Sequence, residues 1–192
     1  SEEQGAVYRH MSDVREVPFY VLLGEPGMGK STVLRYEAQL AGVDVLTART
    51  ISGGTEQYPS PLIIDALDEY RMEGNRSDKA HTLANGMKSA RVSRWRLSCR
   101  AEDWRKAADI AAITAAAGGQ YILVIQLLPL DYEEAKQLLT AFGELDPKGF
   151  LKKAASFGAE AFTENPLILK LLHKAVSKSG VWPASRFDLF QS

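Results

Sequence analysis

Residues 24–31 read Gly24-Glu25-Pro26-Gly27-Met28-Gly29-Lys30-Ser31, and they are the most informative stretch of the chain. They match the pattern GxxxxGK[ST] of phosphate-binding loops. The apolar run Phe19 to Leu23 precedes them and predicts a strand buried on both faces of a parallel sheet. From Lys30 to about Leu40 the residues favour a helix, which Gly42 would end. Strand, glycine-rich turn and helix in this order begin a βαβ unit, so the stretch predicts an α/β fold.

The residue types in this loop suit the binding of a nucleotide with Mg²⁺. Glycines let backbone N–H groups approach phosphate oxygens without a Cβ in between, and the following helix presents its positive end. Lys30 is expected to reach the β- and γ-phosphates, and the Ser31 hydroxyl to bind Mg²⁺. A glycine turn without a ligand is the alternative. The residues predicted to contact the nucleotide are Gly24, Glu25, Pro26, Gly27, Met28, Gly29, Lys30, Ser31 and Thr32.

A second chemical signal is the apolar strand Leu62-Ile63-Ile64, which ends in the acidic segment Asp65-Ala66-Leu67-Asp68-Glu69. Open α/β sheets bind ligands at the carboxyl ends of their strands. Asp65 is therefore predicted to contact the Mg²⁺ held by Ser31, through water. Asp68 and Glu69 lie one turn further on and are predicted to orient or polarise the attacking water. For Asp68 taken alone, a solvated loop or a helix cap is the alternative.

Arg100 follows another predicted strand, near residues 96–99. In a parallel sheet it would emerge at the phosphate edge, where a guanidinium can sense or stabilise the γ-phosphate. A salt bridge to Glu102 or Asp103 is the alternative. Cys99 is expected to fill the core rather than act as a nucleophile, because no histidine lies near it in the sequence.

The remaining patterns complete a sheet and add a helical region. After Pro129 no strand-like run appears, and helices are expected to begin at Asp131, Asp146 and Asn165. We therefore predict a five-stranded parallel sheet sandwiched by helices in residues 1–128, and a small helical lid subdomain in residues 129–192. The predicted strands of the sheet lie near residues 19–23, 43–46, 62–64, 96–99 and 120–127, with helices near residues 30–40, 78–90 and 111–117 and a loop over residues 52–61.

Composition excludes several classes of protein. The chain has 23 basic and 24 acidic residues, so it lacks the positive field that would hold nucleic acid. With one cysteine and three scattered histidines, it has neither an internal disulfide nor the spacing of a zinc site. No apolar run approaches the roughly 20 residues needed to span a bilayer. We therefore expect a cytoplasmic protein without a membrane partner.

Together these segments resemble NACHT-type STAND signalling NTPases, over about residues 17–176. Asp65-Ala66-Leu67-Asp68-Glu69 repeats the family's second acidic motif, and Ser98-Cys99-Arg100 is similar to the segment that carries its sensor arginine. Leu128-Pro129-Leu130-Asp131 resembles the entry into the family's helical domain. Glu164-Asn165-Pro166-Leu167 resembles its proline motif, with Glu164 where some relatives have glycine, which implies that Pro166 packs against the adenine.

The resemblance implies a nucleotide-driven switch. Such a protein is closed with ADP at rest, opens on binding a ligand, exchanges ADP for ATP, and forms a homo-oligomer that activates an effector. Slow ATP hydrolysis would involve Lys30, Asp68, Glu69 and Arg100. Bacterial relatives serve in antiviral defence and in regulation. The resemblance also implies sensor and effector domains that these residues do not include.

Three other functions share the same motifs. An AAA+-like ATPase working as a motor or loader on nucleic acid or protein would have the same loop, acidic strand and helical lid. A small-molecule kinase is a further reading, with Arg91, Arg94, Arg96, Arg100 and Arg105 as candidate lid arginines. A nucleotide-binding module without catalysis also fits. No Asn-Lys-x-Asp signature of guanine recognition occurs, which favours ATP over GTP.

Overall fold

The computed structural model describes residues 10–53, 57–72 and 79–182. The chain divides into two compact units, which we describe one at a time. The first consists of residues up to Leu23 and of Ser31–Ile125; the second consists of Gly24–Lys30 and of residues from Gln126 onward. Residues 24–30, called the glycine loop below, thus belong to the second unit, while the segments on either side of them belong to the first.

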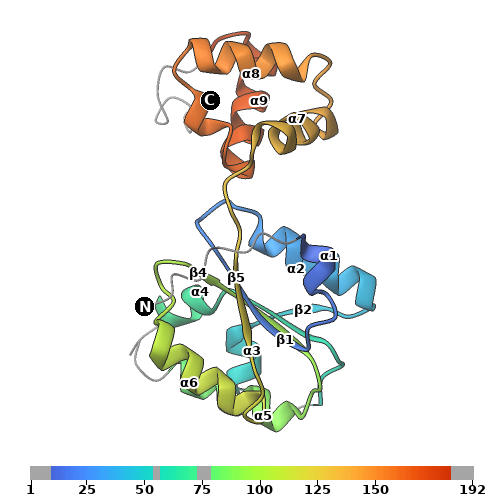
Figure 1. Cartoon of the computed structure of the whole chain (residues 1–192), viewed down its shortest axis with the longest axis vertical. Coiled ribbons are helices and arrows are strands. Elements are labelled where there is room, and N and C mark those ends of the chain that lie inside the picture. The colour runs from blue at the N-terminus through green and yellow to red at the C-terminus, as the bar shows by residue number, and fades with distance from the viewer. Residues whose placement is uncertain (1–9, 54–56, 73–78, 183–192) are drawn as a thin grey trace, which may run out of the picture. The chain divides into compact units, whose positions relative to one another are not determined.

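The first unit is built on a parallel sheet with helices in the connections (Figure 1). The strand order β2-β3-β4-β1-β5 confirms the predicted five-stranded parallel sheet flanked by helices. Because β4 lies between β3 and β1, the carboxyl ends of these three strands are neighbours at one edge. The strands are β1 (Phe19–Gly24), β2 (Val45–Thr47), β3 (Leu62–Asp65), β4 (Trp95–Arg100) and β5 (Leu123–Gln126); the helices are α1 (Met11–Val14), α2 (Lys30–Ala41), α3 (Ala48–Gly53), α4 (Leu67–Met72), α5 (Lys79–Ala90) and α6 (Lys106–Ala116).

Helices cover both faces of this sheet, which accounts for the continuous apolar runs Phe19–Leu23 in β1 and Leu62–Ile64 in β3. On one face, Val21 of β1, Ile64 of β3 and Leu97 of β4 share a core with side chains of the helices α3 to α6. On the opposite face, Tyr20 is fully buried, and the Arg96 guanidinium lies 4.3 Å from the centre of its ring. Helices α1 and α2 lie on that side (Figure 1).

Three short helices of the first unit, α1, α3 and α4, were not predicted. The predicted loop over residues 52–61 is wrong at its start, because α3 extends to Gly53; residues 54–56 lie outside the described residues. Helix α4 follows β3 almost directly, after Ala66. These helices have four to six residues, which is too short for a helical period to stand out in the sequence. The last strand is also shorter than predicted, since Gln120 to Ile122 precede β5.

The described part of the second unit contains the glycine loop and a group of helices with its own core. Asp131, Asp146 and Asn165 cap α7, α8 and α9, as predicted, each accepting a backbone N–H of the first turn. None of the helices in the described part of the chain combines the length and apolar character needed to cross a bilayer. The elements are α7 (Tyr132–Ala141), α8 (Pro147–Ser156), the 3₁₀ helix η1 (Glu160–Phe162) and α9 (Pro166–Ser179).

Candidate functional site

The glycine loop connects β1 to α2, the position that its sequence motif predicts. Gly27 and Gly29 have φ angles of 81° and 90°, in the left-handed region that favours glycine. Left-handed residues in a tight turn can direct successive N–H groups to a common side, which creates a concavity for an anion. In the structure Gly24 and Met28 are buried, Gly27, Gly29, Lys30 and Ser31 are half-buried, and Glu25, Pro26 and Thr32 are exposed.

Lys30 is folded back over the loop that precedes it. Its Nζ atom donates hydrogen bonds to the carbonyl oxygens of Gly24, at 2.7 Å, and Glu25, at 3.2 Å. An ammonium group has three donors, so one remains for a further oxygen after these two bonds. Lys30 therefore holds the curvature of the loop and keeps one donor for a further oxygen.

Asn165 also contacts the glycine loop, and the sequence did not predict this contact. Its Nδ2 atom donates to the carbonyl oxygen of Pro26 at 2.9 Å, and the backbone N–H of Leu167 donates to the carbonyl oxygen of Gly27 at 3.2 Å. Pro166, the predicted adenine contact, lies between them as the first residue of α9 and is half-buried. Its contact with adenine stays a prediction. The signal that could have predicted this contact was the asparagine itself. Its amide oxygen can cap a helix while its NH₂ group donates to another segment.

In the first unit, Asp65 and the turn after it are held by Ser98 of the neighbouring strand β4. Ala66 has a φ angle of 65°, and its N–H donates to the Ser98 hydroxyl at 2.9 Å. The same hydroxyl donates to Oδ1 of Asp65. Ser98 is fully buried and fixes both the turn and the carboxylate. Sequence reasoning did not assign it a role, because that role depends on the pairing of β3 with β4.

Asp68 and Arg100 form an ion pair at the same edge of the sheet. The Arg100 Nε atom lies 2.8 Å from Oδ2 of Asp68, and the Arg100 backbone N–H donates to Oδ1 at 3.1 Å. Asp68 is buried, whereas the Arg100 side chain keeps 34% of its surface exposed. Glu102 and Asp103 were the alternative partners expected from the sequence, and the carboxylate that pairs with Arg100 is instead Asp68. Both oxygens of Asp68 therefore position the arginine.

Glu69 differs from Asp68 in its surroundings. It occupies the first turn of α4 and is exposed, and within the described residues it makes no hydrogen bond or ion pair. A carboxylate in this state can accept a hydrogen bond from water. The role in orienting water that was predicted for both acids stays a prediction, and Glu69 is the one with unused acceptors.

Ser31 and Asp65 supply the kind of ligands that Mg²⁺ prefers. Mg²⁺ binds oxygen atoms and usually keeps several waters, with few ligands from the protein and others from phosphate. Ser31 offers a hydroxyl, and Asp65 retains Oδ2, which has no partner in the described part of the chain. The donor set therefore fits Mg²⁺. Among the described residues, no group of three or more His, Cys, Asp or Glu side chains is arranged to hold a metal ion. Mg²⁺ bound by Ser31 and Asp65 would therefore need further oxygen ligands from phosphate and water.

Helix α4, which carries Asp68 and Glu69, is anchored to α6 by a buried ion pair. Arg71 and Asp109 are 4% and 2% exposed, and Nη2 of Arg71 donates to Oδ1 of Asp109. Nη1 of Arg71 donates to the carbonyl oxygen of Asp103. Oδ2 of Asp109 accepts the backbone N–H of Arg105 at 2.7 Å, just before α6. The pair thus fixes the helix on which the two acids lie.

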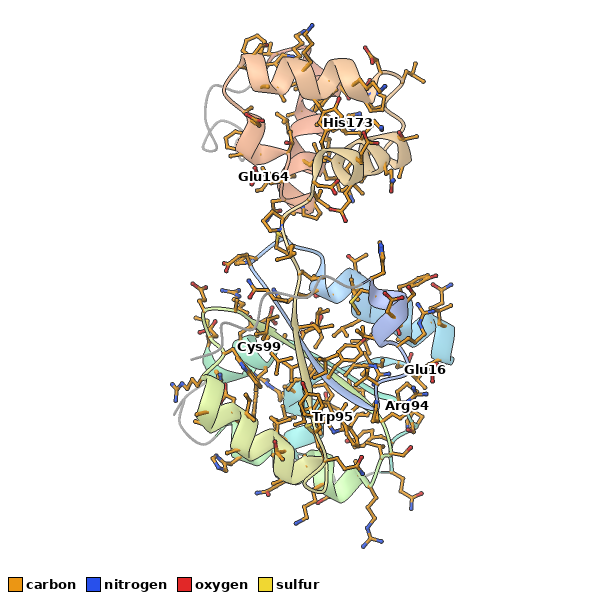
Figure 2. The ribbon with its side chains drawn as sticks, in the orientation of Figure 1. Glu16, Arg94, Trp95, Cys99, Glu164 and His173 are labelled. Atoms are coloured by element: carbon orange, nitrogen blue, oxygen red, sulfur yellow. The ribbon has the colours of Figure 1, made fainter. Side chains whose placement is uncertain are left out.

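Cys99 is buried in the sheet, as predicted (Figure 2). Burial raises the pKa of its thiol from 9.0 to about 12. Because the thiolate is the reactive form, the folded protein at pH 8 should carry about a thousandfold less of it than the unfolded chain. We expect a thiol reagent such as DTNB to label the native protein at least about a hundredfold more slowly than the urea-unfolded protein. The chain has one cysteine, so a Cys99→Ser variant gives the background, and native labelling within about tenfold of the unfolded rate would contradict the prediction.

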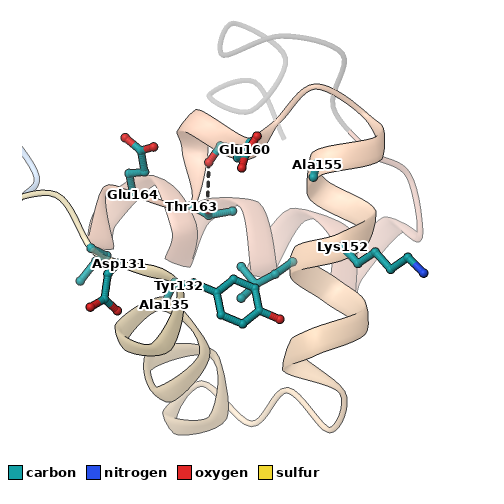
Figure 3. Close-up of a pocket in the computed structure, with 10 residues that line it drawn as sticks. Asp131, Tyr132, Ala135, Lys152, Ala155, Glu160, Thr163 and Glu164 are labelled. Atoms are coloured by element: carbon teal, nitrogen blue, oxygen red, sulfur yellow. Dashed lines mark hydrogen bonds between the residues drawn. The ribbon is translucent and has the colours of Figure 1, made fainter.

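The helical part of the second unit contains a cavity of about 330 Å³ (Figure 3). Its wall includes Tyr132 of α7, Lys152 of α8 and Glu160 of η1. None of the residues predicted to bind nucleotide or Mg²⁺ lines it. The cavity therefore shares no residue with the glycine loop or with the acidic segment.

The resemblance to NACHT-type STAND proteins rests in part on the glycine loop and the acidic segment. The glycine loop has its left-handed glycines, and the acidic segment follows a buried strand. Comparison with known sequences adds no further support to it. No family model matches the chain, and no curated protein sequence matches it significantly.

Proposed function

We propose that this chain is the core of a P-loop NTPase that binds ATP or ADP together with Mg²⁺. The observation that carries the proposal is the glycine loop, with two left-handed glycines and Lys30 folded onto its carbonyl oxygens, between a buried strand and a helix. Backbone N–H groups, a lysine and a helix N-terminus are the usual means of binding nucleotide phosphates. The strand order supports it, because β3 and β4 deliver Asp65 and Arg100 to the edge at which β1 ends.

In this proposal each side chain has a defined task. Lys30 donates to the β- and γ-phosphate oxygens, and Ser31 and Asp65 hold Mg²⁺. The metal, when bound, neutralises charge on the phosphates. Asp68 keeps Arg100 oriented toward the γ-phosphate, and Glu69 accepts a hydrogen bond from the attacking water.

The function that this chemistry fits best is a nucleotide-controlled switch with slow hydrolysis, of the NACHT type of STAND protein. Support comes from the motif resemblance and from two contacts that a bound nucleotide would affect, Asp68 with Arg100 and Asn165 with Pro26. Homo-oligomerisation, an effector, and a role in antiviral defence or regulation belong to this proposal through the resemblance. The formal net charge of −1 argues against a nucleic-acid motor.

Calorimetric titration of the purified chain with ATP and with ADP tests nucleotide binding. We expect both to bind, and we expect EDTA to weaken ATP binding by at least about tenfold, because Mg²⁺ bridges the β- and γ-phosphate oxygens. GTP serves as the comparison for base preference. Absence of binding by ATP and ADP at millimolar concentration would refute the proposal. A tens-fold rise in ATPase rate on adding DNA would favour the AAA+-like motor over the switch.

A further inference from the structure

The side chain of Asn165 performs two tasks at once. Its Oδ1 atom accepts the backbone N–H groups of Leu167, at 3.1 Å, and Ile168, at 3.2 Å, and so caps α9. Its Nδ2 atom donates to the carbonyl oxygen of Pro26 at 2.9 Å. One amide group therefore joins the first turn of α9 to the glycine loop.

The loop fits closely against this end of α9 at Gly27. A Cβ atom on Gly27 would lie 2.7 Å from Oδ1 of Asn165 and 3.0 Å from Cβ of Leu167. Gly29 has a similar left-handed φ angle, but a Cβ atom there would meet nothing within 4 Å. Gly27 is thus required by the packing of the loop on α9 as well as by its backbone conformation.

The first turn of α9 is in turn fixed within the helical core. Ile168 and Leu169 are buried among residues of α7 and α8. The carbonyl oxygen of Glu164, just before the cap, accepts the N–H of Leu130 at 2.7 Å. Because protein interiors are close-packed, a shift of the loop carbonyl oxygens would disturb the contacts of the whole helical core.

We propose that Asn165 is a positioning residue that couples the conformation of the glycine loop to α9, so that nucleotide bound on the loop stabilises the helical core. The inference rests on the proposed function. This coupling is reciprocal. The factor by which bound nucleotide stabilises α9 in this position equals the factor by which α9 in this position tightens nucleotide binding. Asparagine suits the task because its oxygen can cap the helix while a separate NH₂ group donates to the loop. Ionised aspartate has no donor, and serine has a single oxygen for both tasks.

The contact itself can be tested without nucleotide. We expect Gly27→Ala to lower the urea midpoint of unfolding more than Gly29→Ala, which has similar backbone strain without the close contact. In an Asn165→Ala background the effect of Gly27→Ala should fall by at least about half, because the nearest clashing atom is gone. Equal effects of Gly27→Ala in both backgrounds would overturn the coupling.

Hydrogen exchange tests the nucleotide dependence. In the parent chain, ADP with Mg²⁺ should slow exchange at the Leu167 and Ile168 amides by about two- to tenfold, the range expected for one net hydrogen bond. Asn165→Asp keeps the cap but lacks the donor, so this slowing should disappear. Asp146→Asn, the reverse substitution at the N-cap of α8, is the matched control and should keep the nucleotide-dependent slowing.

The outcomes of this experiment separate the two proposals. If the parent chain binds ADP and Asn165→Asp retains the full nucleotide-dependent slowing, the coupling role is wrong and the proposed function stands. If the parent chain binds no nucleotide, the proposed function fails, and nucleotide coupling fails with it. The nucleotide-free comparison of Gly27 and Gly29 still decides whether Asn165 supports the loop.

Discussion

A Lys30→Ala chain is expected to bind ATP about ten- to a hundredfold more weakly than the parent chain. Lys30 already donates to two loop carbonyl oxygens, and its remaining donor is the one assigned to phosphate. A hydrogen bond to a charged group contributes about 1.5–3 kcal/mol, so the loss of this one donor corresponds to about ten- to a hundredfold in affinity. Calorimetric titration with ATP and Mg²⁺ measures the change.

The control for this experiment is Lys88→Ala, which removes the same charge from an exposed position on α5. The ATP affinity of this variant should stay within about twofold of the parent's, because water and salt screen the interaction of an exposed charge with the nucleotide. Thermal unfolding of both variants checks that each remains folded. A Lys30→Ala chain that binds ATP as well as the parent would remove the basis of the proposed function.

Breaking the buried pair of Arg71 and Asp109 should strongly destabilise the first unit. Arg71→Met leaves the Asp109 carboxylate buried without its cation, and breaking one partner of such a pair costs about 3–5 kcal/mol. Combining Arg71→Met with Asp109→Leu should recover part of this loss, because no buried charge then remains from the pair. Urea unfolding curves give the free energies of unfolding for the single and double variants.

Glu16→Gln provides the comparison, since Glu16 pairs with Arg94 at 3.0 Å but its side chain is 86% exposed. Exposed pairs contribute about 0–1 kcal/mol, so this change should be small. If Arg71→Met destabilised the protein no more than Glu16→Gln does, the buried pair would have no special role in anchoring α4.

The parts of the fold that could be predicted are those encoded locally. The apolar run before Gly24 and the caps at Asp131, Asp146 and Asn165 each depend on residues within one turn or strand, and the structure has them where the sequence placed them. Helices α3 and α4 were missed because six residues are too few to reveal a period.

The contacts of the candidate site were harder to predict, because they join distant segments. Asp68 and Arg100 are 32 residues apart, and Ser98 reaches Asp65 across 33. Their partnership depends on the order of strands in the sheet, which periodicity does not reveal. The motif therefore indicated candidate residues. The structure adds that Asp68 pairs with Arg100 and that Glu69 has no partner within the described residues.

The contact of Asn165 with Pro26 also has a consequence for the time course of synthesis. The two residues are 139 positions apart. At a translation rate of about 5–20 residues per second, Asn165 is added roughly 7–28 s after Pro26. During that interval the nascent glycine loop has no partner from α9. The loop must therefore exist on the ribosome without its contact to α9 before that helix has been synthesised.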